Sequence, residues 1–103
     1  MVNKMNSITC DNLYNLLCKN DIIVLDIRNQ SEYLKGHILN SINYPFHSLL
    51  SKSKLSLKTD YTYYVICDLG VSSPMAVNHL LRLGYKAINV SGGMKRWTHE
   101  TYK

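Results

Sequence analysis

A continuous run of β-branched and apolar residues limits the possible folds of this chain more than any other feature. The run covers residues 22–27, Ile-Ile-Val-Leu-Asp-Ile. A strand with one face in water alternates apolar and polar side chains, whereas a strand covered on both faces is apolar almost throughout. The run therefore predicts a strand inside a parallel sheet that has helices on both of its faces.

Strand-like and helix-like segments alternate along the rest of the sequence. Further strands are predicted at residues 7–9, 38–43, 61–67 and 87–90, and helices at 10–19, 31–35, 46–50 and 75–83. Thr9 or Asp11 would cap the first helix, and a last short helix bearing Trp97 would follow Gly92-Gly93. The helix at 75–83 would place five apolar side chains along one face: Ala76, Val77, Leu80, Leu81 and Leu83. This alternation implies right-handed crossovers and a three-layer α/β/α architecture.

Length and composition set the domain count. The sequence of 103 residues has the common size of one domain, and nearly half of its residues are apolar, which is enough for a core. No repeat or linker divides it, so residues 1–103 are expected to form a single domain with its core at about 7–97. No stretch approaches the roughly 20 apolar residues of a membrane span. A cytoplasmic protein without a membrane partner is the expectation.

Charge and histidine spacing argue against two further classes of function. The formal net charge is +5, but the lysines are scattered, and only Lys52, Lys54 and Lys58 form a loose group. This pattern does not favour a nucleic-acid partner. No metal is expected either, because the four histidines lack ligand spacing with each other or with the cysteines: His37, His47, His79 and His99.

Cys67 stands where parallel sheets bind ligands, at the carboxyl end of a predicted strand. The loop of residues 67–73, Cys-Asp-Leu-Gly-Val-Ser-Ser, leads into a helix that Pro74 would open. Such a loop turns several backbone N–H groups toward one point, where they would stabilise a thiolate or another anion. The alternative is an inert, buried cysteine. Cys10 and Cys18 fit that alternative better, because both lie on a predicted helix rather than in a loop and no basic residue stands beside Cys10 in the sequence.

Several motifs, in their order and spacing, resemble those of the single-domain rhodanese family. They are Asp26-Ile27-Arg28, Glu32-Tyr33, Gly36-His37-Ile38, Asn43-Tyr44-Pro45, the loop of residues 67–73, Leu83-Gly84-Tyr85, and Gly92-Gly93 with Trp97. Together the motifs cover about residues 7–97. The resemblance implies a five-stranded parallel sheet of order 1-5-4-2-3. It also implies a sulfurtransferase that carries sulfane sulfur as a persulfide on Cys67, without a bound cofactor.

The resemblance also implies roles for individual residues. Cys67 would be the nucleophile that takes sulfur from a small sulfur anion or a protein persulfide and passes it to a thiol acceptor. The backbone amides of the loop would bind the substrate: Asp68, Leu69, Gly70, Val71, Ser72 and Ser73. Four residues outside the loop would support the architecture: Asp26, Arg28, Glu32 and His37. We expect Arg28 and Glu32, four residues apart, to form a local ion pair.

Two loop positions depart from the family pattern, which has basic residues directly after the cysteine and at the fifth position beyond it. This chain has Asp68 and Ser72 there. An acidic Asp68 would repel a thiosulfate dianion, and Ser72 offers only a neutral hydroxyl. We therefore expect weak activity with thiosulfate and favour a protein persulfide as donor.

The altered loop leaves a second function open, a non-catalytic rhodanese-like module that binds a partner or senses oxidants through Cys67. A phosphatase of the same fold is disfavoured. It would need an arginine six residues after the nucleophile, where this chain has Ser73.

Overall fold

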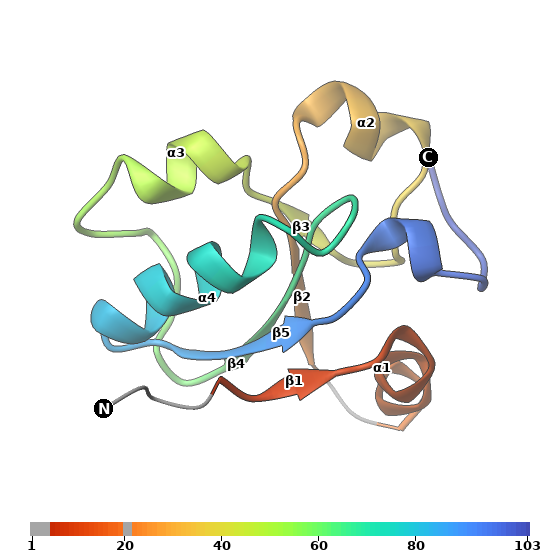
Figure 1. The fold of residues 1–103 in the computed structure, drawn as a ribbon, viewed down its shortest axis with the longest axis horizontal. Helices are drawn as coiled ribbons and strands as arrows, with labels where there is room; N and C mark the ends of the chain where they lie inside the picture. Colours follow the sequence, from red (N-terminus) through yellow and green to blue (C-terminus); the bar gives the residue numbers. More distant parts are fainter. Residues whose placement is uncertain (1–4, 20–21) are drawn as a thin grey trace.

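Strands and helices alternate along the chain in the computed structural model, which describes residues 5–19 and 22–103 (Figure 1). In chain order the elements are β1 (Ser7–Ile8), α1 (Cys10–Leu17), β2 (Ile23–Asp26), α2 (Gln30–Lys35), β3 (Ile42–Asn43), α3 (Phe46–Leu50), β4 (Thr62–Ile66), α4 (Ser73–Arg82), β5 (Lys86–Val90) and the 3₁₀-helix η1 (Met94–Arg96). Each predicted strand has a counterpart. Thr9 caps α1 by accepting a hydrogen bond from the Asn12 amide.

The five strands form one parallel sheet in the order β1-β5-β4-β2-β3. In the centre, Val65 of β4 pairs with Leu25 of β2 on one side and with Asn89 of β5 on the other. This order confirms the α/β fold and the strand arrangement that the family resemblance implies. It also brings the carboxyl ends of β2, β4 and β5 to one edge of the sheet, which positions the site described below.

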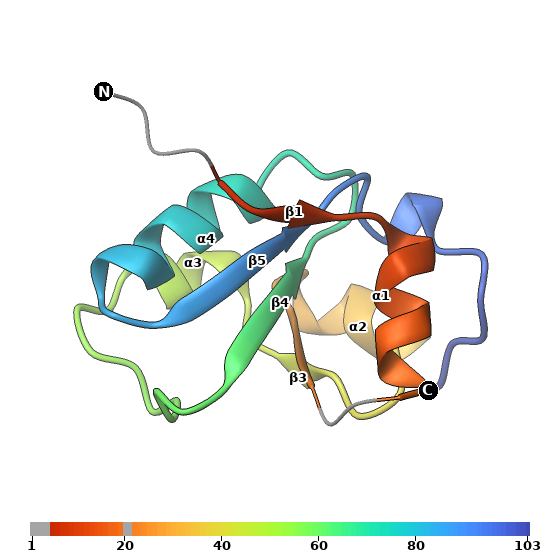
Figure 2. The ribbon, with the colours of Figure 1, turned by 90° about the horizontal axis from the view of Figure 1, so that it is seen from below.

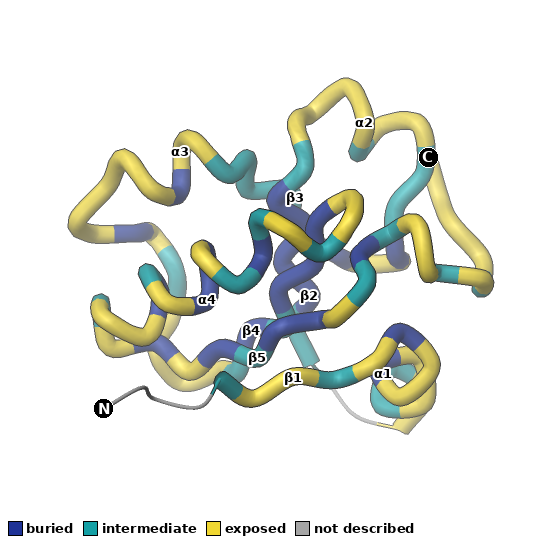
Figure 3. The backbone as a smooth tube through the Cα atoms, in the orientation of Figure 1, coloured by how far each residue is buried: buried dark blue, intermediate teal, exposed yellow. Residues whose placement is uncertain are grey.

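The sheet is covered on both faces, as the apolar run at residues 22–27 predicts. Val24 belongs to a buried cluster with Leu13 of α1, whereas the next residue, Leu25, packs on the opposite face with Leu80 of α4. Accordingly, α1 lies on the near side of the sheet in Figure 2, and α3 and α4 lie on the far side. The inner strands β2, β4 and β5 are mostly buried (Figure 3).

The strand predicted at residues 38–43 is wrong in its first part. Ile38 is buried, but a turn follows it, in which the Ser41 amide donates to the Ile38 carbonyl over 3.0 Å. Asn40 at the tip has a φ of 63°, a left-handed conformation that asparagine tolerates better than most residues. The strand therefore begins only at Ile42.

The apolar face predicted for residues 75–83 is also too wide. The helix begins earlier, at Ser73, and buries Ala76, Val77 and Leu80, whereas Leu81 is 45% exposed. Among the described residues, none of the helices is long and apolar enough to cross a membrane.

Candidate active site

Cys67 is the first residue after the central strand β4, and the residue is 5% exposed. The loop that follows forms an arch beyond the end of the sheet, between α2 and η1 (Figure 1). Gly70 turns the chain there with a φ of 88°, and its amide donates a hydrogen bond to Cys67 Sγ over 3.1 Å. Several loop amides were expected to point at the sulfur. Among residues 68–73, the Gly70 amide is the one that donates a hydrogen bond to it.

A pocket of about 340 Å³ opens beside Cys67. It is lined by Ile27, Arg28, Asn29, Glu32, Cys67, Asp68 and Ser72. The pocket thus brings the loop after β4 together with the segment that joins β2 to α2. Its volume suits a small anion or the tip of a protein side chain.

The remaining predicted site residues lie outside this lining. Leu69 and Val71 project into solvent with exposed fractions of 56% and 72%. The Ser73 hydroxyl is buried and donates to Asn89 Oδ1 over 2.6 Å, so it ties the start of α4 to β5. The His37 ring stacks on Tyr33 at 3.8 Å between ring centroids, with its Nδ1 2.8 Å from the Tyr33 carbonyl oxygen.

The ion pair predicted between Arg28 and Glu32 is wrong. Arg28 instead binds the fully buried Asp26, with Nε 3.0 Å from Oδ1 and Nη2 2.8 Å from Oδ2. Its Nη2 also donates to the Gly36 carbonyl over 2.8 Å. A buried carboxylate requires a partner, and Asp26 at the end of β2 provides a stronger one than exposed Glu32 would. Glu32 lies 3.6 Å from Lys35, in an exposed pair.

These contacts decide the charge beside Cys67. Arg28 is the one basic side chain among the described residues that line the pocket, and the carboxylate of Asp26 neutralises it. Glu32 and Asp68 add two further carboxylates to the lining. The pocket therefore has an excess of negative charge, which opposes the binding of a dianion.

The glycine pair after β5 forms the floor of the Cys67 loop. A Cβ atom on Gly93, whose φ is 66°, would lie 2.7 Å from the Cys67 carbonyl oxygen. A Cβ on Gly70 would lie 2.9 Å from the Gly92 nitrogen. The two segments therefore touch backbone to backbone, and two amides of η1 donate to the loop: that of Met94 to the Cys67 carbonyl and that of Lys95 to the Asp68 carbonyl. Gly92-Gly93 was predicted only as a turn and a family motif, and the sequence did not indicate this contact.

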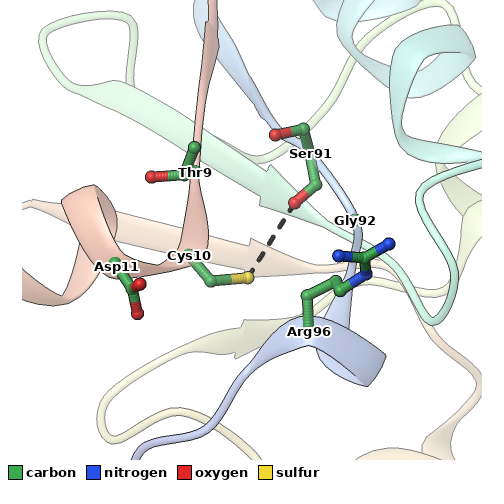
Figure 4. A pocket seen from close by; sticks show the side chains of 6 residues that line it. All are labelled: Thr9, Cys10, Asp11, Ser91, Gly92 and Arg96. Carbon is green, nitrogen blue, oxygen red and sulfur yellow. Dashed lines mark hydrogen bonds between the residues drawn. The ribbon is translucent and has the colours of Figure 1, made fainter.

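A second pocket of about 420 Å³ lies beside Gly92 (Figure 4). Its lining consists of Thr9, Cys10, Asp11, Ser91, Gly92 and Arg96. The expectation that Cys10 lacks a basic neighbour is wrong, because the fold brings Arg96 to it. Burial nevertheless raises the pKa of the Cys10 thiol, Asp11 raises it further, and Arg96 opposes both. Cys10 Sγ also lies 3.4 Å from the Gly93 carbonyl oxygen, so this thiol supports the floor of the loop from its other side.

Within residues 5–19 and 22–103, histidine, cysteine and carboxylate side chains form no group of three that could hold a metal ion.

Comparison with known proteins gives consistent matches. The model of the Rhodanese-like domain family matches residues 9–100. The Thiosulfate sulfurtransferase GlpE of Coxiella burnetii is 31% identical over 85 residues, which are 82% of this chain and 78% of that protein. The crystal structure of a Rhodanese-like domain protein from Staphylococcus aureus is 33% identical, with a TM-score of 0.86 and coverage of 95% of this chain and 97% of that one.

A longer relative matches only in part. The Adenylyltransferase and sulfurtransferase uba4 of Ogataea parapolymorpha is 35% identical over 78 residues, which are 75% of this chain. The match spans 20% of the length of that relative.

Proposed function

The chain belongs to the rhodanese-like domain family, and on this premise we propose that it is a sulfurtransferase that carries sulfane sulfur as a persulfide on Cys67. The observation that carries the proposal is the hydrogen bond from the Gly70 amide to Cys67 Sγ, in the lining of a pocket. A backbone N–H in this position favours a charged sulfur over a neutral one.

The proposed reaction has two displacements. In the first, the Cys67 thiolate attacks the sulfane sulfur of a donor, so that a bond forms from Sγ to that sulfur while the bond from that sulfur to the donor breaks. The donor leaves as sulfite or as a thiolate. In the second, an acceptor thiolate attacks the outer sulfur of the Cys67 persulfide, takes it, and releases the Cys67 thiolate. No net oxidation or reduction occurs.

Pocket charge favours a protein persulfide over thiosulfate as the donor. Thiosulfate has two negative charges, and it would approach Asp68 and Glu32 with no unpaired cation among the lining residues. A protein persulfide has at most one charge at the reacting sulfur, and contacts around the pocket would contribute to its binding. Two relatives whose names include sulfurtransferase support the general reaction, one of them for thiosulfate. The donor and acceptor of this chain are our proposal.

The test is to mix the purified chain separately with thiosulfate and with a persulfide-bearing cysteine desulfurase and to follow its mass. We expect a gain of one sulfur atom with the desulfurase and little with thiosulfate. Cys67→Ser should abolish the gain. The matched control is Cys18→Ser, which removes an exposed thiol at the C-terminal end of α1. This variant should gain sulfur as the unaltered chain does. If neither donor adds sulfur, the non-catalytic module that binds a partner or senses oxidants becomes the better explanation.

A further inference from the structure

We propose that the rim of the Cys67 pocket is a docking surface for a donor protein whose persulfide-bearing loop has apolar side chains and at least one basic side chain. We define the rim as the pocket-lining acidic residues Asp68 and Glu32 together with the exposed apolar residues that follow Cys67 in sequence, Leu69, Val71 and Met75. This inference rests on the proposed function and adds the chemistry of the partner.

The apolar part of the rim is exposed without serving the core. Leu69, Val71 and Met75 are 56%, 72% and 51% exposed. Leu69 and Val71 lie in the Cys67 loop and Met75 in the first turn of α4, so the three flank the nucleophile within nine residues of sequence. Exposed apolar side chains on the loop that a nucleophile begins are typical of a surface that another protein covers. The loop that contains Leu69 and Val71 projects beyond the sheet (Figure 1).

The acidic part of the rim gives the partner its charge. Asp68 and Glu32 face the same pocket from the loop and from α2. Lys35 lies 3.6 Å from Glu32, but this pair is exposed and therefore weak. The neighbouring helix η1, in contrast, has two basic residues, Lys95 and Arg96. The acidic character is thus confined to the side of the rim formed by the loop and α2.

The charge of the whole chain strengthens this preference. With a formal net charge of +5, the chain as a whole repels a basic partner, whereas Asp68 and Glu32 attract one at the pocket. A basic side chain beside the persulfide would therefore orient the partner with its sulfur toward Cys67. An acidic partner loop would be drawn to the rest of the surface and repelled at the rim.

Limited access to the nucleophile favours a donor that projects from a protein surface. Cys67 is only 5% exposed, so the donor sulfur must enter the pocket to reach it. A loop with a persulfide at its tip can do this while its neighbouring side chains stay on Leu69, Val71 and Met75. The Cys67 thiolate then displaces the partner's thiolate from its outer sulfur, and electrons and charge balance without another reactant.

The test uses synthetic persulfide peptides of equal length as probes. One has Lys and Leu beside a single cysteine persulfide, the second has Glu and Leu, and free cysteine persulfide serves as the small donor. The initial rate of sulfur transfer to Cys67 is followed by mass. At low ionic strength we expect the Lys peptide to react about tenfold faster than the Glu peptide, and the ratio to fall as salt is added.

Two variants separate the charge from the apolar contact. Asp68→Asn should reduce the ratio between the two peptides severalfold. Met75→Ser should slow both peptides but not free cysteine persulfide, and Leu81→Ser, at a 45% exposed position of the same helix, is its matched control. Equal rates for the two peptides, faster transfer from the Glu peptide, or equal effects of the two α4 variants would overturn the docking inference.

Two further results have a distinct meaning. If free cysteine persulfide loads Cys67 and the peptides show no preference, the proposed function stands and the docking surface does not. If no donor loads Cys67, both fail. A dimer of this chain that Met75→Ser dissociates, measured by light scattering, would assign the apolar rim to a second copy and overturn the inference.

Discussion

Gly93 lies directly against the backbone of Cys67. A Cβ atom on Gly93 would come within 2.7 Å of the Cys67 carbonyl oxygen, the same atom that accepts a hydrogen bond from the Met94 amide over 2.7 Å. The Cys67 loop is thus held by a segment from near the C-terminal end of the chain. This segment can approach the loop so closely because Gly93 has no side chain.

Gly93→Ala should damage both stability and sulfur transfer. The added methyl meets rigid backbone at a φ of 66°, so we expect a loss of about 2–4 kcal/mol in the free energy of unfolding. Gly84→Ala is the control, because its φ is 93° but no atom lies within 4 Å of the added Cβ. It should cost only about 1–2 kcal/mol of backbone strain and leave transfer intact. Urea unfolding and persulfide loading measure the two effects, and equal losses in the two variants would contradict the close contact.

Asp68→Arg should improve the reaction with thiosulfate. It replaces a carboxylate at the pocket with the kind of charge that a dianion needs, and we expect the loading rate at low thiosulfate concentration to rise about tenfold. Asp60→Arg makes the same charge change before β4, at the opposite end of that strand from Cys67. A comparable gain in Asp60→Arg would show that net charge, rather than charge at the pocket, controls the rate.

Removing Arg28 should be costly because it leaves a fully buried carboxylate without its partner. Arg28→Ala is expected to lower the free energy of unfolding by about 3–5 kcal/mol. Arg28→Lys should recover part of this loss but not the paired bonds to Asp26. Lys35→Ala breaks the exposed pair with Glu32 and should cost about 0–1 kcal/mol. Urea titrations of the three variants measure these losses in the free energy of unfolding. A loss in Lys35→Ala as large as that in Arg28→Ala would contradict the prediction.

Stability should decline at alkaline pH. Burial, with Asp11 as the second cause, raises the pKa of Cys10 above its ordinary 9.0, and burial chiefly raises the pKa of Tyr63 above 10.0. A group whose pKa is higher in the folded state contributes its full stability below the unfolded value and loses it as the pH rises toward the folded value. The melting temperature should therefore fall above pH 9.0.

Cysteine variants identify the source of that decline. Cys10→Ala should flatten the first part of the fall, whereas Cys18→Ala, at an exposed thiol, should not. Slopes are compared rather than absolute melting temperatures, since Cys10→Ala also removes packing. An unchanged slope in Cys10→Ala would exclude this thiol as the cause.

Local patterns predicted the elements of this fold, and long-range contacts explain what they missed. The apolar run at 22–27 was sufficient for a buried strand, whereas the sheet order came from the family resemblance that the motifs carry. The Arg28–Glu32 pairing failed because helical spacing was applied to a residue that precedes the helix, since α2 begins at Gln30. Buried Asp26 then provided the stronger partner.

In the candidate site, too, the features set by local sequence were predictable and those set by long-range contacts were not. Cys67 and its loop follow from one stretch of sequence, so their position at the end of β4 was predictable. The Gly93 contact and the approach of Arg96 to Cys10 join segments from opposite ends of the chain, and neither leaves a local pattern. Adjacent glycines were the one signal that could have indicated a close backbone approach.

Both outer strands of the sheet, β1 and β3, are only two residues long. A long outer strand would offer a row of free backbone groups, a template on which foreign strands can assemble into fibrils or exchange between molecules. Here that template is almost missing at both margins. Self-association by sheet extension is therefore disfavoured, and a partner of the kind proposed above would have to be recognised through side chains instead of main-chain pairing.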